Sequence, residues 1–304
     1  MKRTENRKIG IFFMLLSSLL YGSYGVWARL LGPVFPTFFQ SWTRAFLILL
    51  ILFVILRVKK IPLKIYRKDW KLFGLLGACT SLTLAPVYYA FNHMDISLVT
   101  LIFYSSIVIA NYVFSFIMFK EKITYVKKFA LVQSLIGIVL LYSFVISTNF
   151  TALAFIAATV NGIATALEFL FSKKLTETYD AIFIMFVAYV FIFLSNLIIS
   201  LILKEPMPFT APAKYWGYQT GFLLAALGAY YFGIRGYEYL TATMAGLISV
   251  SEAVFGLLLG LIFFGDKFDS FRIAGAFVIL TAMLLPKLGE MDINKALEES
   301  RADR

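Results

Sequence analysis

Residues 230–266 read YYFGIRGYEYLTATMAGLISVSEAVFGLLLGLIFFGD and decide the fold of this chain. The stretch is strongly apolar, yet it carries Arg235, Glu238 and Glu252. An ionisable group at membrane depth costs roughly 2.5 to 3.5 kcal/mol on insertion scales, so such groups face a cavity or a partner inside a helical bundle. The stretch therefore predicts membrane helices whose charged side chains point into the protein.

The composition extends this interpretation to all 304 residues. Hydrophobic residues make up 61% and charged residues 15% of the chain, whereas a soluble domain has roughly half and a quarter. The net charge of +11 comes from basic residues between apolar runs, as in short cytoplasmic loops, and does not indicate nucleic-acid binding. The single cysteine, Cys79, and the single histidine, His93, exclude a disulfide framework and a zinc site. We expect an integral membrane protein without a cofactor or metal.

Ten apolar runs are long enough to cross about 30 Å of hydrocarbon, which takes about 20 residues of helix. They are predicted at residues 9–31, 36–57, 70–92, 96–119, 127–147, 150–171, 180–203, 217–239, 242–264 and 270–287. Pro86 predicts a kink in the third run. Basic residues concentrate before the first run, in the second, fourth and sixth connections, and in the tail. This bias predicts an inner-membrane protein with both termini in the cytoplasm.

A weak internal repeat relates the two halves of the chain. A shift of 145 residues aligns Glu121 with Asp266 and Lys122 with Lys267. The prediction is a five-helix repeat at residues 1–148, a second at 149–288 and a short cytoplasmic tail at 289–304. Because five crossings is an odd number, the second repeat must be inverted, which is a recurrent transporter architecture. The expected fold class is an all-α membrane protein of ten helices in two inverted repeats.

Short motifs in both halves resemble the drug/metabolite transporter superfamily, specifically its EamA-like ten-helix permeases. They are Leu20-Tyr21-Gly22-Ser23 in the first run, Arg44 after Pro36 in the second, and Glu121 and Gly265-Asp266 at the ends of the fourth and ninth. The resemblance spans residues 9–287 and implies a secondary transporter. Two departures leave kinks in the fourth and ninth runs open. Ser105-Ser106-Ile107 replaces a usual central proline, and Ala253 follows Glu252 where proline is common.

Candidate site residues follow from predicted depth. Glu252 and Arg44 lie near the middle of the membrane, where they would bind opposite charges of a substrate or serve only in helix packing. Aromatic side chains predicted to line the cavity are Tyr21, Tyr24, Tyr88, Tyr89 and Tyr104. Near the cytoplasmic face, Glu168 is expected to pair with Arg235 as an inner gate beside Glu238, the alternative being side chains that only reach towards water. Glu121 and Asp266 are expected to cap the helices that follow them.

The predicted function is secondary transport by alternating access, with export of amino acids or related metabolites. The sequence has no phosphate-binding loop, so a gradient must supply the energy, and proton coupling and uncoupled transport both fit. The expected partners are a small-molecule substrate and the lipid bilayer, with a monomer or homodimer. The alternatives are an intramembrane enzyme, which would need a nucleophile and base that are missing, and a lipid-precursor carrier, which would need several central arginines.

Overall fold

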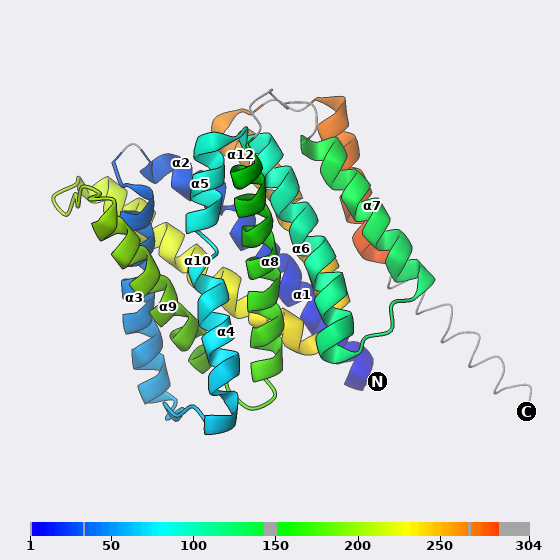
Figure 1. Cartoon of the computed structure of the whole chain (residues 1–304), viewed down its shortest axis with the longest axis horizontal. Helices are drawn as coiled ribbons and strands as arrows, with labels where there is room; N and C mark the ends of the chain where they lie inside the picture. The colour runs from blue at the N-terminus through cyan, green and yellow to red at the C-terminus, as the bar shows by residue number, and fades with distance from the viewer. Residues whose placement is uncertain (1, 33, 143–150, 267–268, 286–304) are drawn as a thin grey trace, which may run out of the picture.

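The computed structural model describes residues 2–32, 34–142, 151–266 and 269–285, and these ranges contain helices and no strand (Figure 1). The predicted turn at residue 148 and the tail 289–304 lie outside the described residues. The helices are α1 (Lys2–Gly22), α2 (Tyr24–Leu31), α3 (Thr37–Val58), α4 (Trp70–Ser81), α5 (Ala85–His93), α6 (Ile96–Phe119), α7 (Tyr125–Tyr142), α8 (Ala152–Leu175), α9 (Ala181–Ile202), α10 (Ala213–Tyr239), α11 (Ala242–Ser249), α12 (Ser251–Phe264) and an unlabelled final helix, Ser270–Leu285, with one 3-10 turn, Arg67–Asp69, before α4.

Eight helical segments of the described chain are long and apolar enough to cross a membrane. They are Asn6–Leu31, Thr37–Val58, Arg67–His93, Ile96–Phe119, Tyr125–Tyr142, Ala152–Leu175, Ala181–Ile202 and Ala242–Phe264. Large apolar side chains point outwards from them, including Val58 at 76% and Ile262 at 71% exposure, as expected for surfaces that meet lipid. The protein is therefore a multi-pass helical membrane protein. The helix α10 and the shorter helix Ser270–Leu285 are not among the eight.

Three of the membrane segments are broken. The first breaks at Ser23 between α1 and α2, and the third breaks at residues 82–84 between α4 and α5. The break in the third segment lies directly before Pro86, which confirms the predicted kink, because proline has no N–H and cannot continue the helix. The ninth predicted helix breaks at Val250 between α11 and α12.

The ninth predicted helix breaks without a proline, and two serines account for the break. The hydroxyl of Ser249 donates to the carbonyl of Gly246 at 2.8 Å, and that of Ser251 donates to Ile248 at 2.7 Å. Such bonds compete with the backbone ladder and bend helices. The fourth predicted helix, α6, runs unbroken from Ile96 to Phe119, so the open question about kinks is answered differently for the two helices.

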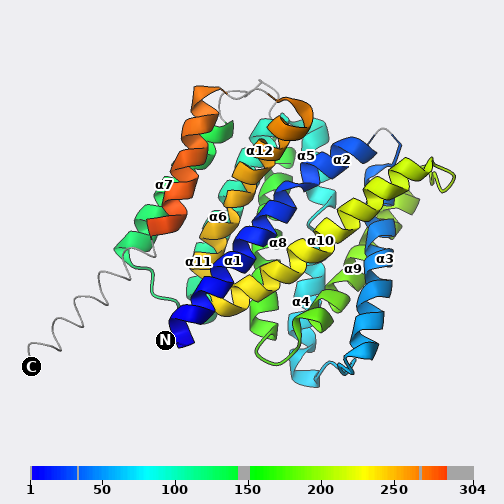
Figure 2. The ribbon, with the colours of Figure 1, turned by 180° about the vertical axis from the view of Figure 1, so that it is seen from behind.

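The helices pack in pairs that are distant in sequence. Helix α1 lies against α10 and α12, α3 against α9, and α6 against α8 (Figures 1 and 2). Helix α7 pairs with Ser270–Leu285 at one edge, where a Cβ on Gly137 would lie 3.1 Å from the carbonyl oxygen of Gly275. Gly22 has the same role inside the bundle, because a Cβ there would lie 2.9 Å from the backbone nitrogen of Gly256. Glycines at these positions let the helix backbones touch.

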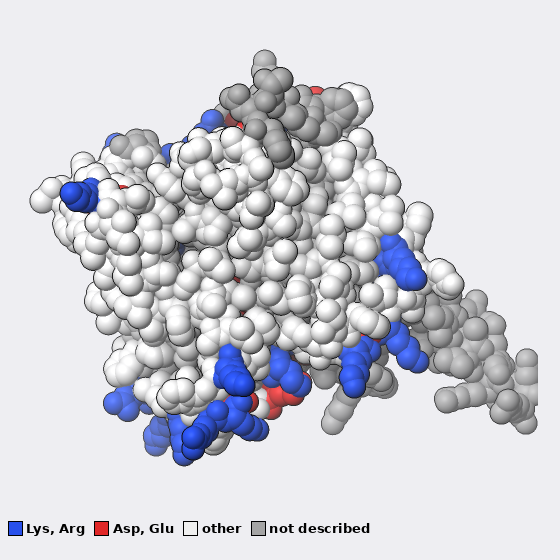
Figure 3. Space-filling model, viewed as in Figure 1, with Lys and Arg blue, Asp and Glu red and all other residues white. Residues whose placement is uncertain are grey.

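Lys and Arg side chains gather along the lower edge of the molecule in Figure 3, where the connection between α3 and α4 lies, and the middle of the face carries almost none. We call this side the basic end. Its residues include Lys59, Lys60, Lys64, Arg67, Lys68, Lys120, Lys122, Lys173 and Lys174. We call the other side, where α2 and α12 finish and α6 begins, the opposite end. The two ends separate charge as the interfaces of a membrane protein do.

The predicted caps at Glu121 and Asp266 are wrong, because closer residues cap the helices that follow. The hydroxyl of Thr124 accepts from Lys127 N at the start of α7, and Asp269 accepts from Arg272 N at the start of the last helix. The carboxylate of Glu121 instead bonds to the first residues of α11. That of Asp266 forms an ion pair with Arg29 at 3.2 Å.

The chain ends α6 and α12 in the same way. Lys120 and Gly265 both adopt left-handed conformations, with φ of 52° and 68°. The next residue donates its backbone N–H back into the helix, from Glu121 to Ser115 O and from Asp266 to Gly260 O, each at 3.4 Å. These are Schellman-type endings. They coincide at the 145-residue shift found in the sequence.

Glu205, between α9 and α10, caps a helix distant in sequence. Its carboxylate accepts from the backbone nitrogens of Phe38 and Phe39 at 3.2 and 2.8 Å, and from the hydroxyl of Ser200 at 2.9 Å. An anion at the start of a helix satisfies unpaired N–H groups and complements the helix dipole. The connection between α9 and α10 is thereby fixed to the start of α3.

Candidate functional site

A cavity of about 500 Å³ lies in the centre of the bundle. Its wall includes Ala28, Thr37 and Thr100, near the ends of α2, α3 and α6 at the opposite end of the molecule. Towards the basic end, the wall stops at Phe169 and Tyr230. The cavity therefore opens towards the opposite end and is closed towards the basic end. Its size suits a small organic molecule.

Glu252 lines this cavity, and the break at Val250 decides its environment. The break makes Glu252 the second residue of α12, in the first turn, where the helix dipole favours a negative charge. Its Oε1 accepts a hydrogen bond from Tyr104 Oη at 3.0 Å. A second pocket, of about 390 Å³, shares Tyr104 and Glu252 with the cavity and extends to Arg29 and Asp266 at the opposite end. Glu252 is therefore approached from two sides.

Glu168 shares the cavity with Glu252, which the sequence interpretation did not foresee. That interpretation placed Glu252 alone at mid-depth and Glu168 near the cytoplasmic face. In the structure Glu168 is buried, lines the cavity and is hydrogen-bonded to Tyr230. Each acid thus has a tyrosine partner from a different helix. The cavity holds two carboxylates rather than one.

Arg44 supplies the cationic group of the cavity. Its guanidinium carbon lies 3.7 Å from the ring centroid of Phe222, and Nη1 donates to Gln40 O at 3.4 Å. Among the described residues, no carboxylate lies within ion-pair distance of Arg44. A guanidinium that stacks on a ring keeps its edge available for a planar anion such as a carboxylate.

Three of the five predicted tyrosines line the cavity. Tyr21 and Tyr24 pack with ring centroids 5.0 Å apart, and Tyr104 completes the wall beside Glu252. Tyr88 and Tyr89 are not among the lining residues. Tyr88 packs on a phenylalanine ring and Tyr89 stacks on a histidine ring, at 5.1 and 4.1 Å between centroids.

The structure does not bring the predicted gate residues together. Arg235 forms an ion pair with Glu238 at 2.6 Å and donates to Tyr239 Oη at 2.5 Å. Glu168, its expected partner, faces the cavity instead. The i, i+3 spacing explains the observed pair, because Arg235 and Glu238 share one face of α10.

Several polar wall residues were missed from the sequence. Gln40 lines the cavity from the first turn of α3, and Asn161 and Asn196 line it from inside α8 and α9. Asn161 donates to Thr83 O at 2.6 Å, in the broken part of the third membrane segment. The Oε1 atom of Gln40 is buried without a hydrogen-bond partner. An amide side chain inside an apolar run is itself a sequence signal. The reasoning that identified the charged residues in the apolar runs could therefore have identified all three amides.

The described residues contain no group of three or more His, Cys, Asp or Glu side chains that could hold a metal ion. The side chains that line the cavity include two carboxylates, one guanidinium, amides, hydroxyls and aromatic rings. Such a set can bind a small polar or zwitterionic molecule through charge-assisted hydrogen bonds.

A multi-pass helical bundle around a central cavity with charged lining residues is typical of membrane transport proteins. The EamA-like transporter family model matches residues 8–143 and 152–286, so the chain belongs to the EamA-like transporter family, as the short motifs indicated. No curated protein matches the chain in sequence. A solved structure described as "Crystal structure of protein" superposes with a TM-score of 0.80 at 14% identity, covering 93% of this chain and 98% of that one. At this identity the likeness concerns the fold.

Proposed function

We propose that the protein exports small zwitterionic metabolites, of which amino acids are the simplest class, by alternating access. The observation that carries the proposal is that Glu168, Glu252 and Arg44 all line one cavity. A solute with an ammonium and a carboxylate group matches this arrangement, because each of its charges finds the opposite charge. The tyrosine rings would hold its side chain.

The proposed architecture has ten membrane helices in two inverted repeats, residues 1–148 and 149–288, followed by the tail 289–304. The matching endings of α6 and α12 support the repeat, and so does the division of the family match into 8–143 and 152–286. In this scheme α10 and Ser270–Leu285 are the eighth and tenth crossings. Two similar halves give two states of similar energy, which alternating access requires.

The proposed orientation places the basic end, with both termini, in the cytoplasm of a cell whose inner membrane holds the protein. The gathering of Lys and Arg at this end supports it. The cavity then faces outwards in this conformation. We further propose that a monomer suffices, since the cavity is formed within one chain, and that a proton exchanged at Glu252 or Glu168 can drive the cycle.

The test is counterflow in proteoliposomes loaded with unlabelled amino acids, amines or nucleobases. We expect uptake of a labelled amino acid that is abolished in both Glu252→Gln and Arg44→Gln and retained in Glu177→Gln, which changes an exposed acid at the basic end. A proton gradient should accelerate transport if the cycle is coupled. Absence of transport for every member of the panel, under either gradient, would refute the proposal.

A further inference from the structure

The cavity is closed towards the basic end by a packed layer of side chains. Tyr237 donates to Asn111 Oδ1 at 2.9 Å and stacks on Phe169 at 5.2 Å between centroids. Asn111 also lies against Gly246 of α11, where a Cβ would lie 2.6 Å from its Cγ. A small space of about 30 Å³ lies between Glu252 and this layer. This layer depends on α11 staying where it is, against α6 and α10.

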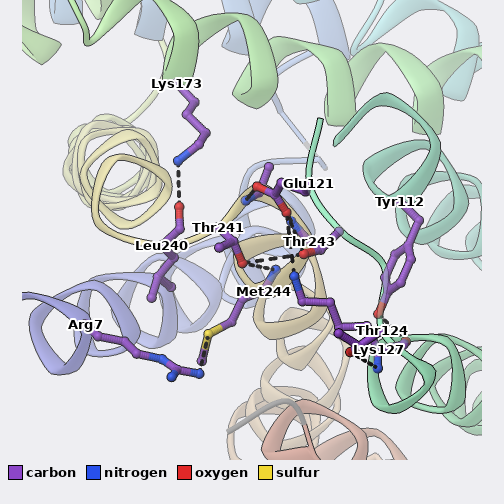
Figure 4. Close-up of polar contacts among 11 residues, drawn as sticks. Arg7, Tyr112, Glu121, Thr124, Lys127, Lys173, Leu240, Thr241, Thr243 and Met244 are labelled. Carbon is purple, nitrogen blue, oxygen red and sulfur yellow. Dashed lines mark hydrogen bonds and ion pairs between the residues drawn. The ribbon is translucent and has the colours of Figure 1, made fainter. Parts of the chain in front are cut away.

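Glu121 holds the start of α11 in that place (Figure 4). Its carboxylate accepts from Ala242 N at 2.5 Å, Thr243 N at 3.1 Å and Thr243 Oγ1 at 2.7 Å. The side chain is only 11% exposed, and Lys127 Nζ lies 3.9 Å away. Charge-assisted bonds to the unpaired N–H groups of a helix start are among the stronger contacts in proteins. Two such N–H bonds and one bond from a hydroxyl concentrate here on one carboxylate.

Lys173 of α8 holds the end of α10, directly before the turn that leads into α11. Its ammonium donates to the carbonyl oxygen of Tyr237 at 2.5 Å, where α10 ends. It also donates to that of Leu240 at 2.6 Å (Figure 4). A cation on a helix end and an anion on the next helix start both match the local dipoles. Lys173 belongs to the same half of the chain as α10 and α11, whereas Glu121 belongs to the other half. Of these two charged residues, Glu121 is therefore the one whose contact connects the two halves.

The equivalent contact is absent at the opposite end, where the cavity is open. The 145-residue shift makes Asp266 the counterpart of Glu121 and Ser97, at the start of α6, the counterpart of Ala242. The nitrogen of Ser97 donates to Asp95 at 3.1 Å, while Asp266 pairs with Arg29 at an exposed position. One carboxylate contact is formed at the closed end, and its counterpart is not formed at the open end.

We infer that Glu121 is the latch of the inner gate: its carboxylate bound to the start of α11 keeps the cavity shut towards the basic end, and release of that contact opens it. The inference rests on the alternating access proposed above. Opening requires α11 to move away from α6, which separates Asn111 from Gly246 and disrupts the closing layer. The contact of Glu121 connects the two halves of the chain at the end of α6 and the start of α11, which must separate when the cavity opens towards the basic end.

The test measures sided cysteine accessibility, which needs no knowledge of the transported solute. In a Cys79→Ala background the chain has no other cysteine, so single cysteines can be introduced at Ser249, which lines the small space beyond Glu252, and at Thr100, in the wall near the open end. A membrane-impermeant thiol reagent is then applied from either side. We expect Glu121→Ala to raise labelling at position 249 from the basic side at least tenfold and to lower labelling at position 100 from the other side.

The paired readout separates a latch from a merely structural contact, because general loosening would raise labelling at position 249 without lowering it at position 100. Glu177→Ala is the control, since Glu177 is an exposed acid at the same end that forms an ion pair with Lys174 and, among the contacts of the described residues, makes no bond to α11. Should Glu121→Ala fail to fold, Thr243→Val removes one of the three bonds and should give a smaller shift in the same direction. Labelling like that of the control in the folded variants would overturn the inference. A shift in accessibility without any transport would leave the latch intact and refute the proposed solute.

Discussion

Asn161→Leu is expected to destabilise the protein by exposing a backbone defect. The break before Pro86 leaves carbonyl groups of the third membrane segment without helical partners, and Asn161 Nδ2 satisfies Thr83 O at 2.6 Å. Leucine has a similar volume and no donor. The variant therefore removes the hydrogen bond while keeping α8 packed against α4 and α5.

The expected loss is about 1 to 2 kcal/mol in the free energy of unfolding. An unsatisfied buried carbonyl costs about 1 to 3 kcal/mol, and the lower part of that range applies because Thr83 is half-buried and lines the cavity, from which water can replace part of the bond. Unfolding of the purified protein in mixed detergent micelles, titrated with denaturing detergent, measures this quantity.

Asn92→Leu is the matched control. Asn92 makes the same kind of bond, from Nδ2 to Tyr88 O at 2.9 Å, but within one exposed helix turn. We expect a change of less than about 0.5 kcal/mol there, as for ordinary surface substitutions. Equal stability of the two variants would refute the reasoning that the hydrogen bond from Asn161 to Thr83 O stabilises the break between α4 and α5.

Three further predictions concern the cavity and the helix contacts. Arg44→Gln should weaken binding of an amino acid about 30-fold, or about 2 kcal/mol, and leave binding of the corresponding amine unchanged; isothermal calorimetry of both ligands checks this. Gly22→Leu should force α1 away from α12 beside Glu252 and lower the melting temperature, whereas Gly74→Leu, which has open space around it, should not. Glu205→Ala should cost roughly 1 to 2 kcal/mol through loss of the α3 cap, with equal denaturation midpoints for this variant and Glu177→Ala contradicting the assignment.

The membrane segments could be predicted from the sequence because apolar runs of sufficient length have few other uses. Glu252, Arg44, Tyr21, Tyr24 and Tyr104 were found by the same logic, since each is a polar group inside such a run. Counting residues along a helix gives the depth of a side chain in the membrane, and a central cavity is lined by side chains near the middle depth.

The direction in which a side chain points could not be predicted. Glu168 lies on a helix whose faces are nearly all apolar, so no periodic pattern indicates that its side chain faces the cavity rather than the cytoplasm. The contacts of Glu121 with α11 join residues 121 positions apart, and no local pattern encodes them. The break at Val250 depends on serine hydroxyls, which are weaker signals than proline.

The three helix breaks differ in the chemistry that holds them. The third segment breaks at a proline, and because proline has no N–H, the missing backbone bond cannot form in any conformation. At Ser23 and at Ser249 and Ser251 the carbonyls bond to hydroxyls, while the backbone N–H groups are still present. A hydroxyl can rotate away from the carbonyl at little cost, and the backbone N–H can then donate the helical hydrogen bond to that carbonyl. The first and ninth segments therefore contain reversible joints and the third a permanent bend. In the transport cycle proposed above, we expect straightening in the two segments that meet at Gly22 and Gly256.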